Sequence, residues 1–171
     1  MTKFWRNGRF GDDTFVALDD AAPLPHSAAV IVSLPRWRTD RATLLAHDAP
    51  IAIQVDPVAE LSPATDALDQ LAAIVIPFAK FSDGRGYSLA RRLRDEFHFN
   101  GEIRATGDVL LDQLPLMLRC GFDAFAISHP PTLAALEAGH LPAIPEVYQV
   151  ASRGRARAKL GTSTNFASPT G

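Results

Sequence analysis

Short apolar runs rich in β-branched residues return at a steady interval through the middle of the chain, and this spacing restricts the possible folds most. Five of these runs are predicted strands: Ala29–Ser33, Ile51–Val55, Ala73–Pro77, Glu102–Ala105 and Ala124–Ile127. The first three are apolar almost throughout. That pattern is typical of strands that are covered on both faces, as in a parallel sheet.

Helical patterns lie between and after these strands. The predicted helices are Thr39–His47, Ser88–Phe97, Val109–Cys120 and Pro131–Ala138. Pro115 lies inside the third pattern, so that helix either kinks there or begins near Asp112 after a short irregular lead. Gly121 is a natural stop for the same helix. Strands that alternate with helices indicate βα units joined by right-handed crossovers.

The fold class that follows is α/β, with a mostly parallel sheet built from about five βα units. Five units are too few for a closed eight-stranded barrel, which leaves an open doubly wound sheet or a partial barrel. Residues before about Ala28 are expected to add a short N-terminal β extension, with a strand at Thr14–Leu18. We expect one domain over residues 1–151. The tail at residues 152–171 is basic and then rich in Ser, Thr, Gly and Pro, which predicts disorder.

Composition limits the kinds of partner and compartment. The net charge of −2 argues against nonspecific binding to nucleic acid or to an anionic membrane, because such binding needs a basic excess. The N-terminus lacks the apolar run of a signal peptide, and no apolar stretch is long enough to cross a bilayer. Cys120 is the single cysteine, so an internal disulfide is excluded. We therefore expect a cytoplasmic protein.

The junction after the third predicted strand is the strongest candidate for a ligand site. Its candidate ligand-binding residues are Lys80, Asp83, Gly84, Arg85 and Gly86. Two glycines allow close approach of the backbone, and free N–H groups at a helix start favour anions. The Arg85 guanidinium adds a fork of donors suited to sulfate, phosphate or carboxylate. The alternative is a purely structural loop, in which Asp83 caps a turn.

Neighbouring arginines differ in their expected partners. Arg91 and Arg92 each precede an acidic residue by four positions, so we interpret them as surface helix pairs and discount them. Arg85 and Lys80 have no such local partner. This difference is what favours Arg85 as the ligand-binding cation.

A second junction follows the fourth predicted strand, with Arg104 and Asp108 as candidate ligand-binding residues. Arg104 falls within or at the end of a strand, where a charged side chain needs a partner or a ligand. Asp108 is its natural partner, or else caps the next helix. A buried pair without catalytic meaning is the alternative interpretation.

Candidates for catalysis are few. Asp108 and His129 are the two side chains that could supply acid–base chemistry, His129 from the loop after the last predicted strand. That loop is rich in proline, and a structural role for His129 is the alternative. The histidines lack metal-ligand spacing, and no Gly-rich dinucleotide fingerprint follows any strand. We expect no metal and no cofactor.

Two long segments resemble an uncharacterised bacterial family. They are FSDGRGYSLARRLR at residues 81–94 and GEIRATGDVLLDQLPLMLRCGFDAF at residues 101–125. Members of that family are labelled as oxidoreductases involved in sulfite reduction, and their genes lie beside those for sulfite reductase. The resemblance implies a role in assimilatory sulfate or sulfite reduction, with components of the sulfite reductase system as partners. It implies no catalytic mechanism.

Three functions are compatible with these observations. The first is an accessory protein of sulfite reduction that binds a small oxyanion or a partner protein. The second is an enzyme acting on a small anionic substrate held by Arg85, Arg104 and Asp108. The third is a non-catalytic interaction module, with a homodimer that covers an exposed sheet edge.

Overall fold

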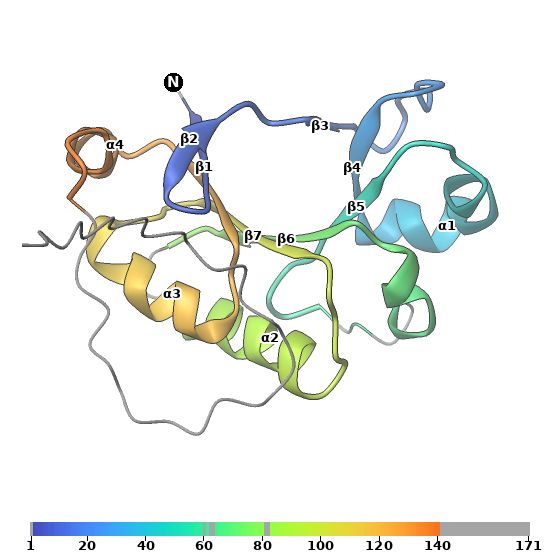
Figure 1. The fold of residues 1–171 in the computed structure, drawn as a ribbon. Coiled ribbons are helices and arrows are strands. Elements are labelled where there is room, and N and C mark those ends of the chain that lie inside the picture. Colours follow the sequence, from blue (N-terminus) through green and yellow to red (C-terminus); the bar gives the residue numbers. More distant parts are fainter. Residues whose placement is uncertain (1, 60, 62–63, 81–82, 141–171) are drawn as a thin grey trace, which may run out of the picture.

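The computed structural model describes residues 2–59, 61, 64–80 and 83–140 (Figure 1). The strands are β1 (Lys3–Arg6), β2 (Arg9–Gly11), β3 (Phe15–Ala17), β4 (Ala29–Ser33), β5 (Ile51–Gln54), β6 (Ala73–Phe78), β7 (Glu102–Gly107) and β8 (Ala124–Ile127). The helices are α1 (Leu34–Leu45), α2 (Gly84–Asp95), α3 (Leu114–Cys120) and α4 (Pro130–Glu137), with short 3₁₀ helices η1 (Thr65–Gln70) and η2 (Leu111–Gln113). The predicted tail at residues 152–171 lies outside the described residues. No helix in the described part of the chain has both the length and the apolar character to span a membrane.

All eight strands form one sheet in the order β2-β1-β8-β7-β6-β5-β4-β3. From β3 to β8 each strand is parallel to its neighbour, and these six strands follow one another in chain order. A doubly wound sheet reverses its strand order at one point, whereas this sheet never does. The sheet is a curled half-barrel, so the partial-barrel alternative is correct. All five predicted strands are present. With β1, β2 and β3 the sheet has eight strands, more than the five that about five βα units would supply.

The N-terminal extension divides into two parts. β1 pairs antiparallel with β8 on one side and with β2 on the other, which gives the expected small antiparallel element. β3 falls within the predicted strand Thr14–Leu18 but lies at the opposite edge, parallel to β4. The chain therefore contributes to both edges of the sheet before its first helix begins.

Most of the core lies between the sheet and its helices. α1, η1, α2 and α3 share one buried cluster with alternate residues of the strands, among them Val32, Ile53, Ile74, Ile103 and Phe125. The intervening strand residues face the concave side, where Ala52, Ala73 and Val75 form a smaller buried cluster with Phe15 and Ile31 packed against it. Because these strands are buried on both faces, their sequences are continuous apolar runs.

A three-residue connection requires the sheet to curl. Residues 12–14 join β2 to β3, which are the two edge strands. Seven spacings of about 4.8 Å would hold these edges about 34 Å apart in a flat sheet. The chain from Gly11 to Phe15 spans at most about 14 Å. The two edges therefore approach each other, and the connection passes over the concave face (Figure 1).

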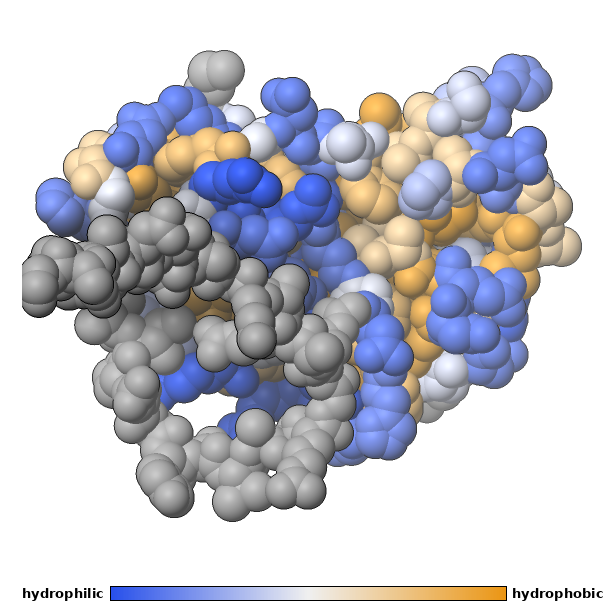
Figure 2. Space-filling view, in the orientation of Figure 1, coloured by the Kyte–Doolittle hydropathy of each residue, from blue (hydrophilic) through white to orange (hydrophobic). Residues whose placement is uncertain are grey.

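The Arg104 side chain on β7 lies under this connection and is only 2% exposed. Its Nη1 donates to both carboxylate oxygens of Asp13, at 2.8 and 2.7 Å, and its Nε and Nη2 donate to Glu102 Oε1, at 3.0 and 2.9 Å. The rings of Phe4 and Phe15 lie over the guanidinium, with centroids 4.3 and 5.2 Å away. In Figure 2, hydrophilic side chains gather beside the β1–β2 hairpin over the middle of the sheet, and apolar ones gather over β4 and β5.

The prediction that Asp108 is the natural partner of Arg104 is wrong. Arg104 is a buried ion-pair residue, as the alternative interpretation has it, but its partners are Asp13 and Glu102. Four residues along an extended strand separate two Cα atoms by about 13 Å. Gly107 then ends β7 with a φ of +89°, and the Asp108 N–H donates to Phe78 O at 2.9 Å. Asp108 is therefore held at the end of the sheet, away from the Arg104 guanidinium.

Local signals explain most helix boundaries. α1 begins five residues before the predicted Thr39 because the Ser33 hydroxyl accepts a hydrogen bond from the Arg36 N–H at 3.1 Å, which caps the helix. Near Pro115 the structure follows the second alternative, since η2 forms an irregular lead and α3 starts at Leu114. Gly121 ends α3 in the left-handed conformation, as predicted.

Candidate functional site

The segment Asp83–Gly86 is the start of α2 rather than a loop before it. Asp83 is the N-cap residue, and its carboxylate accepts a hydrogen bond from the Arg85 N–H at 3.1 Å. The helix therefore begins at Gly84, four residues before the predicted Ser88. An Asp at this position satisfies one of the N–H groups that a helix start leaves without a partner.

The same carboxylate binds the Arg85 side chain. Arg85 Nε and Nη2 donate to the two oxygens of Asp83 at 2.8 and 2.7 Å, which is a paired, fork-shaped contact. These side-chain hydrogen bonds, followed by the one from the Arg85 backbone, lower the pKa of Asp83 to about 2. The expectation that Arg85 has no local acidic partner is wrong, because the N-cap side chain folds over the first turn and reaches a residue only two positions ahead.

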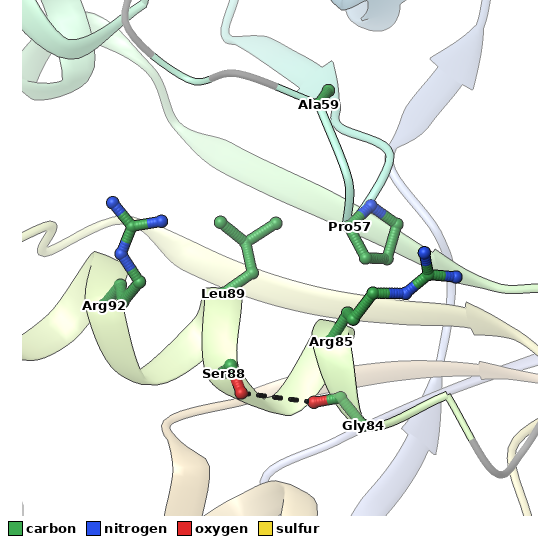
Figure 3. A pocket seen from close by; sticks show the side chains of 7 residues that line it. All are labelled: Pro57, Ala59, Gly84, Arg85, Ser88, Leu89 and Arg92. Atoms are coloured by element: carbon green, nitrogen blue, oxygen red, sulfur yellow. Dashed lines mark hydrogen bonds between the residues drawn. The ribbon is translucent and has the colours of Figure 1, made fainter.

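A pocket of about 450 Å³ lies along one face of α2 (Figure 3). Its helical lining consists of Gly84, Arg85, Ser88, Leu89 and Arg92, and Pro57 and Ala59 line it from the segment that follows β5. The Ser88 hydroxyl donates to the Gly84 carbonyl at 3.3 Å. The pocket thus has a guanidinium near each end and an apolar part between them.

Arg92 is the second arginine that lines the pocket, although its spacing from Glu96 predicts only a surface ion pair. Its Nε donates to Glu96 Oε2 at 3.2 Å, so the predicted surface pair is confirmed, and its guanidinium lies 5.6 Å from the centroid of the Phe97 ring. Arg92 lines the pocket even though it forms this ion pair. The signal that could have found it is spacing, because seven residues are nearly two helical turns and return to the same face.

The two glycines at the start of α2 have different surroundings. A Cβ on Gly86 would lie 2.6 Å from Cζ of the Phe78 ring, whereas a Cβ on Gly84 would meet nothing within 4 Å. Gly86 therefore lets the first turn of α2 pack directly on the end of β6. Close packing of helix and strand accounts for this glycine without a ligand.

The remaining candidates do not gather at the pocket. Lys80 lies just beyond β6 and is exposed, Asp108 lies at the end of β7, and neither is among the lining residues. Arg104 faces the opposite side of the sheet. His129 is the N-cap residue of α4, where its Nδ1 lies 2.9 Å from Oγ1 of the buried Thr132. Arg85, Arg104 and Asp108 therefore do not form one site.

The pocket's lining is suited to holding an anion. It contains two guanidiniums, and the described lining residues include no acidic side chain. Among the described residues no group of three or more His, Cys, Asp or Glu side chains could hold a metal ion. Cys120 is buried, and burial raises the pKa of its thiol.

The contrast between the glycines gives a matched pair of variants. Gly86→Ala should lower the free energy of unfolding by about 1–3 kcal/mol, because the new methyl group must displace the packed Phe78 ring. Gly84→Ala should change it by less than about 0.5 kcal/mol, because the added methyl group meets open space. Urea unfolding of both variants measures the difference. Equal effects would show that the close packing at Gly86 has been misassigned.

Comparison with known families gives one identification. The family model described as a bacterial protein of unknown function, DUF934, matches residues 52–158, which is more than half of the chain. Comparison with curated proteins finds no match. The matched range runs from the second residue of β5 to beyond α4 and therefore includes every described lining residue of the α2 pocket. The chain belongs to the DUF934 family of bacterial proteins.

Proposed function

We propose that this protein is an accessory protein of assimilatory sulfate or sulfite reduction that binds a small oxyanion in the α2 pocket. The observation that carries the binding role is the pair of guanidiniums, Arg85 and Arg92, in one pocket. The pathway rests on the resemblance of residues 81–94 and 101–125 to a family linked with sulfite reductase. Components of the sulfite reductase system would be its partners.

The donors of Arg85 support this assignment. Its contact with Asp83 uses Nε and Nη2, and in the described part of the chain Nη1 donates to no protein group. The side chain is 64% exposed, so an anion can reach Nη1 from solvent. A hydrogen bond from a cation to an oxyanion is stronger than a bond between neutral groups.

The geometry favours binding over catalysis. Asp108 and His129, the two acid–base candidates, lie outside the pocket, and the lining supplies cations, one hydroxyl and apolar surface. An enzyme acting on a small anion at this site would need a proton donor or acceptor within hydrogen-bond reach. The described lining offers only Ser88, whose hydroxyl already donates to the Gly84 carbonyl.

Substitution of Arg85 tests the proposed function. Arg85→Ala should weaken sulfate or sulfite binding about tenfold or more, and Arg85→Lys should recover part of the loss, because an ammonium cannot reproduce the fork. Thermal stability should change little, since surface ion pairs contribute little. Titration calorimetry of these variants, with Arg91→Ala as an exposed control on the same helix, measures the effect. Identical isotherms for wild type and Arg85→Ala would contradict the proposal.

A homodimeric interaction module is the second candidate. The dispersal of Arg85, Arg104 and Asp108 favours it, and so does the β3 edge, where Val16 is 50% exposed. An open edge strand offers unpaired backbone groups to a second chain. This candidate predicts a dimer at micromolar concentration that Val16→Lys dissociates. Sedimentation equilibrium tests it, and a wild-type monomer would contradict it.

A further inference from the structure

Arg85 and Arg92 are held apart along α2. Seven residues of α-helix separate their Cα atoms by a rise of about 10.5 Å. The acidic partner of Arg85 is the N-cap residue Asp83, and that of Arg92 is Glu96, at the other end of the helix. Each ion pair draws its guanidinium away from the other. Figure 3 shows the two side chains on either side of Leu89, with their guanidiniums directed toward opposite ends of the pocket.

The surface between the two cations is apolar. Leu89 is buried at the middle of the helical wall, and Pro57 and Ala59 lie opposite it in the segment after β5. A volume of about 450 Å³ is in the range of pockets that hold whole small molecules. A single sulfate at one guanidinium would leave the apolar middle and the second cation unused.

We infer that the α2 pocket takes an organic dianion, with an anionic group at each end and an apolar segment between them. One end contacts Arg85, the other contacts Arg92, and the middle lies on Leu89, Pro57 and Ala59. Both side chains are more than half exposed, at 64% and 54%, so they can bind the ligand without a rearrangement of the core. This inference rests on the proposed function, because it assigns a ligand class to the same pocket.

A series of straight-chain dicarboxylates from succinate to suberate tests the inference, with hexanoate as a monoanionic control and sulfate as the small oxyanion. Titration calorimetry should show an optimum length at which the dicarboxylate binds about tenfold tighter than hexanoate. Arg85→Ala and Arg92→Ala should each lower the affinity for that dicarboxylate to the affinity for hexanoate. Arg91→Ala, on the same helix but outside the pocket, should leave it unchanged.

The outcomes separate the two proposals. If sulfate binding depends on Arg85 but no dicarboxylate binds tighter than hexanoate, the dianion inference is wrong and the proposed function stands. If Arg92→Ala does not change the affinity for the tightest-binding dicarboxylate, the dianion inference is also wrong. If neither sulfate nor any dicarboxylate responds to Arg85→Ala, both proposals are contradicted.

Discussion

A guanidinium keeps its charge in a protein interior, so a buried arginine must be surrounded by groups that compensate it. Arg104 is such a residue, at 2% exposure in the middle of β7. Glu102 compensates it from the same strand, and Asp13 compensates it from the connection between the two edge strands. Asp13 lies on a connection that is long enough only if the sheet is curled. The contact and the three-residue connection therefore impose the same shape on the sheet.

This arrangement is one reason for placing the proposed ligand site away from Arg104. Phe4 and Phe15 cover the Arg104 guanidinium, and Arg6 contacts Glu102 at 3.0 Å, so the charges of this cluster are paired with one another. A buried charge whose partners are complete is part of the structure rather than a free donor. The proposed ligand site lies on the helical side instead, where α2 packs on β6 through Gly86 and Arg85 and Arg92 line a pocket.

The strands could be predicted because strands buried on both faces have continuous apolar runs. The end of α3 at Gly121 could be predicted because it depends only on the conformation of that residue. The partners of Arg104 could not. Asp13 lies 91 positions away in the chain, and only the folded sheet brings it to β7. β1 and β2 are short, and β1 depends on the distant β8 for its second pairing. At the candidate site, Arg85 lines a pocket, but its contact with Asp83 could not be predicted from a helix that is expected to begin at Ser88. The spacing of Arg92 and Glu96 predicts their ion pair, but it does not indicate that Arg92 also lines a pocket.

In the proposed function, anions bind at the α2 pocket and not at the buried arginine. Nitrogen-15 NMR of the arginine Nε–Hε groups, recorded during a sulfate titration of the wild-type protein, tests it directly. We expect saturable shifts for Arg85, for its neighbour Arg92 in the pocket, and for the backbone amides of Gly84 and Ser88, while the signal of Arg104 stays unchanged. A saturable shift at Arg104 without one at Arg85 would show that the anion binds elsewhere.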